Sequence, residues 1–454
     1  MSWTISRRAL LRGGAAALTM GGAVAVRLGS HFVATAASKA TRSAADLRDR
    51  IEGMLVGSLI GDAAGGPIEF IPAERVRKFA PTVHQWKDEE RLDGERCAKL
   101  SAAFRLLSYE DLRPKPAPYG PWAAKGPPGT LTDDSRHKII LMAALAEAAE
   151  KHRQLEPADL ARAYLAFEQR AIFRHDIQLR GLCHDWLKEQ NAACRWLLGE
   201  RGTPRALPPE RLWGGMPTVM GQMTLLPLAA LSPGQPKKSY VAAYRMSFSD
   251  NGAAKDLNAA IVAGLSEALL MPPDAANNGH RWDAVRRAML DTDPYDYAHV
   301  PWVPRPTQRW LDFAVSAASD CDHRPARLFH QLETKLGART WWEAHVTFAS
   351  VMSILTLCPD HPLAAMQLAL DMGHDTDSTC QLLGAFLGAA YGTAAFPAEM
   401  RQTVTERLQA DYAESLEAWV DLLTSEQDRS GKGLTAAATS DPRPAAQTDA
   451  DGQK

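Results

Sequence analysis

Apolar side chains recur at intervals of three and four residues over most of the chain, which is the spacing of an amphipathic helix. Runs of alternating β-branched residues are nearly absent. The pattern therefore predicts an all-α fold built as one large multi-helix bundle. The predicted helices cover residues 46–65, 132–151, 157–173, 177–198, 217–231, 254–270, 282–290, 307–318, 341–357, 362–372, 375–391 and 397–423.

Two parts of the chain depart from this pattern. Residues 79–129 are rich in Pro, Trp, Tyr and charged residues, which predicts a long surface excursion with little regular structure. Residues 427–454 turn to Ser, Thr, Gly, Asp, Pro and Ala, a composition that cannot bury a core, so we expect a disordered tail. The folded domain is predicted to span residues 44–426.

The N-terminal segment has the features of an export signal. Arg7 and Arg8 form a twin-arginine pattern, small apolar residues follow over residues 13–26, and a small-x-small cleavage motif begins at Ala34. We therefore expect residues 1–40 to be a twin-arginine leader and the mature protein to be periplasmic or extracellular. It would meet a membrane only during export. The alternative is a basic, disordered leader without this role.

The composition excludes some function classes. Of the 454 residues, 46% are hydrophobic and 23% are charged, as in ordinary soluble globular proteins. The formal net charge of −2 gives no electrostatic basis for binding nucleic acid. The six cysteines form no C-x-x-C pair, so most are expected in the core, although a pair could bridge in an oxidising compartment.

Glycines recur every four residues in two predicted helices, where each costs about 1 kcal/mol relative to Ala. Their spacing places them on one face of each helix. This indicates the close approach of another helix backbone or of a ligand, with tight helix packing alone as the alternative. The glycines are Gly53, Gly57, Gly61 and Gly65 in the first helix, and Gly384 and Gly388 in the helix at 375–391.

The first acidic cluster is Thr132-Asp133-Asp134-Ser135, at the start of a predicted helix. Thr132 is a favourable N-cap, and acidic residues in the first turn suit the helix dipole. Capping alone explains this local pattern. It is also compatible with metal binding, because a helix N-terminus favours the ionised carboxylate that a metal ligand must be.

The second acidic cluster contains Asp375, Asp377 and Ser378, which offer three hard oxygen ligands on one tight turn. Oxygen-only ligation favours Mg²⁺, Mn²⁺ or Ca²⁺ over Zn²⁺. If the fold brings both clusters together, four carboxylates crowd one site, and they need protons or metal cations for compensation. The nearby His137 and His374 are more typical of packed histidines than of ligands.

A third candidate is Glu69, which follows the helix-breaking Gly65-Gly66-Pro67. On this turn its carboxylate could reach into a neighbouring cleft. The alternative is an ordinary solvated glutamate in a loop.

Three motifs together resemble the ADP-ribosylglycohydrolase family, in their order and wide spacing, over residues 46–423. The resemblance implies an all-α fold with two Mg²⁺ ions in a central cleft, with Mn²⁺ as an alternative. The motifs are Gly57-x3-Gly61-Asp62-Ala63-x-Gly65-x-Pro67-x-Glu69, Thr132-Asp133-Asp134-Ser135 and Gly373-His374-Asp375-Thr376-Asp377-Ser378. The implied metal ligands are Thr132, Asp133, Asp134, Asp375, Asp377 and Ser378, and the implied catalytic residues are Glu69, Asp134 and Asp375.

The chain departs from the family pattern in several places, including the segments 213–217, 221–223 and 248–252, which by the resemblance shape substrate specificity. His374 replaces a usual Gly, and Ser135 and Ser378 stand where Thr is commoner. Substrate-binding candidates are Trp213, Gly214, Gly215 and His374, with the glycine backbone placed for a pyrophosphate. Tyr109, Tyr119, Trp122 or Trp213 could stack on an adenine.

The expected function is a Mg²⁺-dependent hydrolase that cleaves the glycosidic bond of ADP-ribose conjugates. Its partner would be an ADP-ribose-like small molecule or an ADP-ribosylated protein. One alternative is a hydrolase of another N- or O-glycoside on the same fold. Another is a non-catalytic ADP-ribose-binding or crystallin-like protein, against which the intact acidic clusters argue, because unpaired carboxylates are costly to retain without a cation.

Overall fold

The computed structural model describes most of the chain between residues 43 and 437. The described residues are 43–71, 73–80, 82–109, 120, 122, 126–174, 176–272, 281–337 and 339–437. The predicted leader (1–40), Tyr119 and the last part of the predicted tail (438–454) lie outside these residues. The last helix ends at Ala437, beyond the predicted domain end at residue 426.

The described residues are helical and contain no strand, so the all-α prediction is confirmed. A single β-bridge pairs Thr218 with Glu343. The α-helices are α1 (Ala44–Gly65), α2 (Ala73–Phe79), α3 (Gly94–Ala103), α4 (Asp133–Glu150), α5 (Pro157–Phe167), α6 (Ile177–Leu197), α7 (Met220–Thr224), α8 (Pro236–Met246), α9 (Ala253–Ala268), α10 (Asp283–Asp291), α11 (Pro306–Asp320), α12 (Pro325–Lys335), α13 (Ala344–Leu357), α14 (Pro362–Met372), α15 (Thr376–Tyr391), α16 (Ala398–Tyr412) and α17 (Leu416–Ala437). The 3₁₀ turns are η1 (Gly66–Ile68), η2 (Ala171–Phe173), η3 (Pro209–Gly215), η4 (Leu226–Leu231), η6 (Tyr297–His299) and η7 (Thr393–Ala395).

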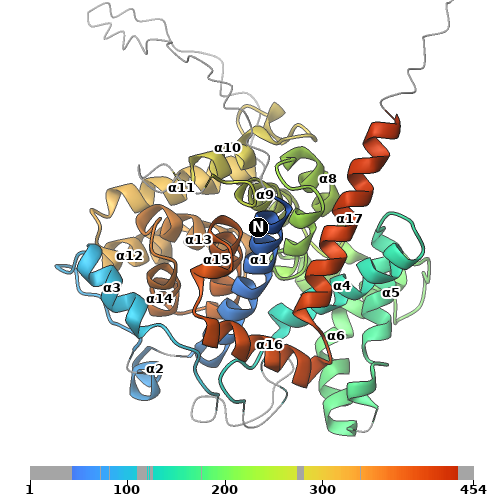
Figure 1. Ribbon diagram of the computed structural model, residues 1–454, viewed down its shortest axis with the longest axis horizontal. Coiled ribbons are helices and arrows are strands. Elements are labelled where there is room, and N and C mark those ends of the chain that lie inside the picture. Colours follow the sequence, from blue (N-terminus) through green and yellow to red (C-terminus); the bar gives the residue numbers. More distant parts are fainter. Residues whose placement is uncertain are drawn as a thin grey trace, which may run out of the picture. The chain divides into compact units, whose positions relative to one another are not determined.

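Two antiparallel helices, α1 and α15, form the centre of the bundle (Figure 1). Their glycines meet, as the sequence indicated. A Cβ atom added to Gly61 would lie 2.1 Å from the carbonyl oxygen of Cys380, and one added to Gly57 would lie 2.3 Å from that of Gly384. Only glycine permits this backbone-to-backbone approach, since any real Cβ would overlap the partner helix.

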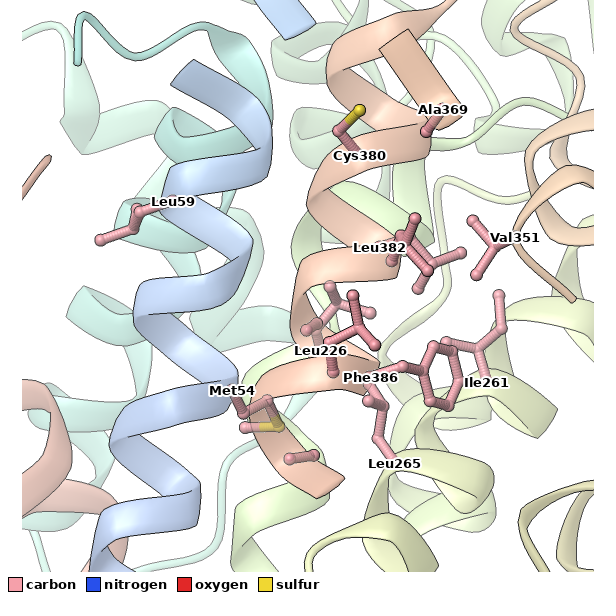
Figure 2. Close-up of a cluster of buried hydrophobic side chains, with 14 of the residues drawn as sticks. Met54, Leu59, Leu226, Ile261, Leu265, Val351, Ala369, Cys380, Leu382 and Phe386 are labelled. Atoms are coloured by element: carbon pink, nitrogen blue, oxygen red, sulfur yellow. The ribbon is translucent and has the colours of Figure 1, made fainter. Parts of the chain in front are cut away.

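The hydrophobic core surrounds this central pair. Figure 2 shows Leu382 and Phe386 of α15 facing Val351 of α13 and Ile261 of α9, and all four side chains are buried. In the described part of the chain, no helix combines the length and the apolar character needed to cross a bilayer.

The segment 79–129 contains more regular structure than the sequence predicted. Asp93 caps α3 by accepting a hydrogen bond from the backbone N–H of Arg96 (2.8 Å), and α3 packs against α14. Cys97 and Leu100 of α3 are buried, and the Cys97 sulfur lies 3.9 Å from that of Cys358. The prediction of little regular structure is therefore wrong for residues 94–103. The helix is too short to stand out against its Pro- and Trp-rich surroundings.

Other helix predictions need smaller corrections. The sequence analysis missed α2, α8 and α12, although Pro236 and Pro325 mark the first positions of the last two. The predicted helix at 397–423 is divided at Ala413, whose left-handed φ of 57° ends α16. The one at 217–231 is divided into α7 and η4, because Pro227 cannot donate the backbone hydrogen bond of a continuous helix.

The glycine contact predicts opposite effects for two Gly→Ala substitutions. Gly61→Ala should lower the free energy of unfolding by about 3 kcal/mol or more, because its methyl group overlaps the α15 backbone. Gly181→Ala is the matched control, since Gly181 lies in the exposed interior of α6 with nothing within 4 Å of an added Cβ. It should raise stability by up to about 1 kcal/mol through helix propensity. Urea denaturation measures both, and equal effects would contradict the close approach.

Candidate functional site

Three helix ends meet at the acidic clusters: the C-terminal end of α1 and the N-terminal ends of α4 and α15. Asp62, fully buried near the end of α1, joins the first two. Its carboxylate accepts hydrogen bonds from the backbone N–H (3.1 Å) and hydroxyl (2.6 Å) of Thr132, and from the backbone N–H (3.2 Å) and hydroxyl of Ser135. One carboxylate thus satisfies two backbone donors of the first turn of α4.

The N-terminal end of α15 is tied to the segment that follows α1. The hydroxyl of Thr376 donates to the carbonyl of Gly65 (2.8 Å). The backbone N–H of Phe70 donates to the carbonyl of His374 (2.8 Å). These bonds bring the turn that carries Glu69 beside the second acidic cluster.

The two acidic clusters therefore share one site. Asp133, Asp134 and Asp377 place one carboxylate oxygen each within 4.8 Å of the others, and so do Glu69, Asp375 and Asp377. Asp377 belongs to both groups. The hydroxyl of Ser378 also crosses between helices, donating to Asp134 Oδ2 at 3.4 Å.

Burial raises the pKa values of Asp133, Asp134 and Asp375. Desolvation, the charge of Asp377 and that of Asp133 hold the pKa of Asp134 well above its ordinary value. Desolvation and the charge of Asp377 do the same for Asp375. For Asp133, desolvation raises the pKa to about 7, although the charge of Arg136 opposes the rise. The folded protein therefore gains from any cation that enters this site.

The donor set fits a hard divalent cation. All the acidic ligands offer oxygen, as Mg²⁺, Mn²⁺ and Ca²⁺ prefer, and Asp134 Oδ1 is buried without a hydrogen-bond partner among the described residues. Two groups that share one carboxylate can hold two ions, with Asp377 between them. The second ligand group joins Glu69 to the α15 cluster, which the spacing of the motifs did not reveal.

A cavity of about 410 Å³ opens above the carboxylates. Its acidic floor contains Glu69, Asp133, Asp134 and Asp375, with Ser378 beside them. Its remaining wall is largely apolar and aromatic. That wall includes Phe70, Trp186, Trp213, Met216, Val219, Met220, Met223 and Trp342.

Two of the wall aromatics reach solvent. Phe70 and Trp342 are 44% and 41% exposed, and their rings meet edge to face at 5.7 Å. Because both also line the cavity, they lie where it meets solvent.

His137 is a neutral part of the cavity wall. Burial, together with the charges of Arg136 and Lys138, lowers its pKa to about 3. Its Nδ1 lies 2.8 Å from the hydroxyl of Tyr164, and its ring packs against Trp186 at 4.8 Å between centroids. This environment agrees with the expectation of a packed histidine.

The predicted ligands do not all have the same surroundings in the structure. Asp133, Asp134, Asp375, Asp377 and Glu69 converge, and Ser378 lines the cavity. The hydroxyl of Thr132, by contrast, donates to Asp62 while it accepts the backbone N–H of Asp134 (3.2 Å), so it supports the first turn of α4.

Only one of the predicted substrate-binding residues is part of the described cavity lining. Trp213 lines the cavity, whereas the described lining does not include Gly214, Gly215 or His374. His374 stacks on Trp341 with 3.4 Å between ring centroids, and its Nε2 lies 3.3 Å from Glu333. These contacts hold His374 next to the Asp375 turn and outside the described cavity lining.

Two of the aromatics proposed for adenine stacking lie elsewhere. Tyr109 is fully buried, and Trp122 packs under the guanidinium of Arg136 at 3.8 Å. Neither lines the cavity in the part of the chain that the structure describes.

The sequence analysis assigned no role to Asp62 and passed over Lys138, and both prove to be buried at the site. A signal existed for Asp62, since it is the only charged residue in an otherwise apolar and small stretch from Met54 to Gly65. For Lys138, only the packing shows that the side chain is buried.

Residues 43–432 match the model of a protein family described as ADP-ribosylglycohydrolase. The chain belongs to the ADP-ribosylglycohydrolase family. As a member, it has the family's all-α fold and is a glycoside hydrolase of a metal-dependent family. A solved structure titled "ADP-ribosylglycohydrolase-related protein complex" is 18% identical, with a TM-score of 0.47, and the match covers 84% of this chain and 99% of that one. None of the curated proteins compared with the chain matches it.

The raised carboxyl pKa values predict how stability depends on pH. The pKa of Asp133 is about 7 in the folded protein against 3.8 ordinarily, so the folded state binds this proton more tightly than the unfolded chain does. The resulting stability is complete below about pH 4 and is lost as pH rises through 7. The melting temperature of the metal-free protein should therefore fall between about pH 4 and 7.

Calorimetry of the metal-free protein across this pH range tests the prediction. Added Mg²⁺ should remove much of the loss, because metal replaces the protons. Asp133→Asn, which cannot ionise, should show a shallower pH dependence. A melting temperature that rises with pH in the metal-free wild type would contradict the proposed electrostatics.

Proposed function

We propose that this protein is a Mg²⁺-dependent hydrolase that cleaves the glycosidic bond of ADP-ribose conjugates, using two ions for which Mn²⁺ can substitute. The main support for the proposal is the pair of carboxylate groups that share Asp377, since the other four members, Glu69, Asp133, Asp134 and Asp375, line the floor of the cavity. The all-oxygen donor set supports Mg²⁺ or Mn²⁺.

The carboxylates have different places in the proposed reaction. Asp133 and Asp134 would hold one ion, Asp375 and Glu69 the other, and Asp377 would contact both. When bound, the metals supply Lewis acidity, which polarises ribose hydroxyls and lowers the pKa of water near the anomeric carbon.

Glu69 is the candidate for proton transfer. It lines the cavity, is only partly buried, and follows a helix-ending turn that the His374–Phe70 hydrogen bond positions. A carboxylate there can accept a proton from the attacking water as the glycosidic bond breaks, as carboxylates do in other glycoside hydrolases. Asp134 and Asp375 assist by holding their charge beside the developing oxocarbenium ion.

The cavity wall supports a second candidate within the same reaction class. The described lining contains tryptophans and methionines but no Lys or Arg, so a pyrophosphate there would depend on backbone donors and metal. Such a wall suits an N- or O-glycoside with an apolar or aromatic leaving group. Its substrate would be a riboside without a pyrophosphate.

Removing the shared ligand tests the proposed centre. Asp377→Ala should reduce turnover at least about 10³-fold and abolish tight Mg²⁺ binding, because both carboxylate groups lose a member. Asp421→Ala, at a 61% exposed position on α17, is the matched control and should retain both properties.

Three measurements make this test specific: calorimetric titration with Mg²⁺, titration with ADP-ribose, and mass-spectrometric detection of ADP-ribose released from modified peptides. Metal binding without affinity for ADP-ribose, together with cleavage of simple ribosides, would favour the second candidate. Full activity of Asp377→Ala would eliminate the centre, and wild type that binds neither metal nor ADP-ribose would favour a non-catalytic protein.

We also propose that the protein is exported in folded form, on the support of the twin-arginine pattern at Arg7 and Arg8. Residues 1–40 fused to a folded reporter should direct it to the periplasm of a bacterium that has the twin-arginine pathway. Replacing both arginines by lysine should retain the charge but block export. Export of the doubly substituted fusion at the original level would contradict this proposal.

A further inference from the structure

A second polar layer lies one helical turn behind the carboxylates. Ser58 precedes Asp62 by four residues on α1, while Lys138 and Gln381 follow Asp134 and Asp377 by four residues on α4 and α15. Residues four apart lie on the same face of a helix. The three helices that carry the carboxylates therefore also carry the three members of this layer.

Hydrogen bonds hold the layer together. The ammonium group of Lys138 donates to Gln381 Oε1 at 2.9 Å, and the Ser58 hydroxyl donates to the same oxygen at 3.0 Å. Gln381 Nε2 donates in turn to the backbone carbonyl of Gln222 on α7 (3.1 Å). Ser58, Lys138 and Gln381 are each no more than 1% exposed.

Lys138 is a buried cation within the electric field of the acidic site. Burial lowers the pKa of Lys138, and the negative charges of Asp134, Asp62, Asp133 and Asp377 offset only part of that fall. The described residues show no carboxylate hydrogen-bonded to this ammonium, which contacts a neutral amide instead. An unpaired buried charge is retained only where nearby opposite charges compensate it, and here these are the carboxylates of the site.

We propose that Lys138 is a counter-charge of the metal centre, held by Gln381 and Ser58, that stabilises the metal-free fold and weakens the binding of divalent cations. The inference rests on the metal centre proposed above. Lys138 does not line the cavity among the described residues, so it is a positioning residue and has no contact with substrate.

The positive charge of Lys138 would cause both the stabilisation of the metal-free fold and the weaker binding of cations. Without metal, the ammonium offsets part of the repulsion among the buried carboxylates, so the three helix ends can assemble before any ion arrives. With metal, the same charge repels the incoming cation through a medium less polar than water. Loss of a merely structural contact would loosen the ligands and weaken metal binding, so the sign of the change separates the two roles.

The test compares Lys138→Met and Lys138→Gln with wild type. Methionine keeps the approximate shape without charge or hydrogen bond, and glutamine keeps a donor for Gln381 without charge. Both variants should bind Mg²⁺ and Mn²⁺ about tenfold more tightly in calorimetric titrations at pH 8.5, where protons compete least for the carboxylates. Both should melt lower than wild type without metal and gain more from added metal.

Lys151→Met is the matched control. Lys151 caps the far end of the same helix, its side chain is 55% exposed, and it pairs with Glu147. Its substitution should leave metal affinity and the metal-induced gain in melting temperature unchanged.

The outcomes are distinguishable. If wild type binds neither metal, the metal centre fails and this inference fails with it. If wild type binds metal but Lys138→Met binds it equally or more weakly, the inference alone is overturned. Should Lys138→Met fail to fold even with metal, Lys138→Gln decides: tighter binding supports the counter-charge, and unchanged or weaker binding overturns it.

Discussion

The close approach of α1 and α15 is the constraint on which the site depends. Helix backbones can come this near only where glycine faces the partner, and Gly57 and Gly61 provide such a face. Because the two helices are antiparallel, the last turn of α1 lies beside the first turn of α15. A wider separation would move Asp377 away from Glu69 and break the hydrogen bonds that tie the turn after α1 to the start of α15.

The electrostatics of the site follow from that geometry. Several helix ends converge, and each helix N-terminus favours negative charge, yet burial and mutual repulsion oppose ionisation of so many carboxyl groups. The protein relieves this conflict at several levels. Asp62 is saturated by donors from the first turn of α4, Lys138 supplies a fixed positive charge, and divalent cations would provide the rest.

The separation between chemistry and recognition is equally clear in the cavity. The carboxylates come from the ends of rigid helices, whereas the aromatic wall includes Trp213 of η3 and Trp342, which precedes α13. Reaction type therefore depends on the central bundle. Under the proposed function, the wall that includes Trp213 would select the leaving group.

Local pattern was enough to determine the all-α class, the glycine faces and the two acidic helix starts, because helical periodicity and capping depend on neighbours in the chain. It also led to the family, through motifs whose order is visible without coordinates. The local pattern did not predict the short helix α3 or the break at Ala413, because the sequence signal is weak at both places and packing decides the structure there.

Only the tertiary structure decided which polar groups would be buried together. Thr132, a predicted ligand, donates to Asp62, and His374, a predicted substrate contact, stacks on Trp341. Lys138, which the sequence analysis passed over, is buried one helical turn from the acidic site. Burial and charge compensation arise between segments far apart in the chain, so the sequence supplies the groups while the packing of α1, α4 and α15 sets their chemical roles.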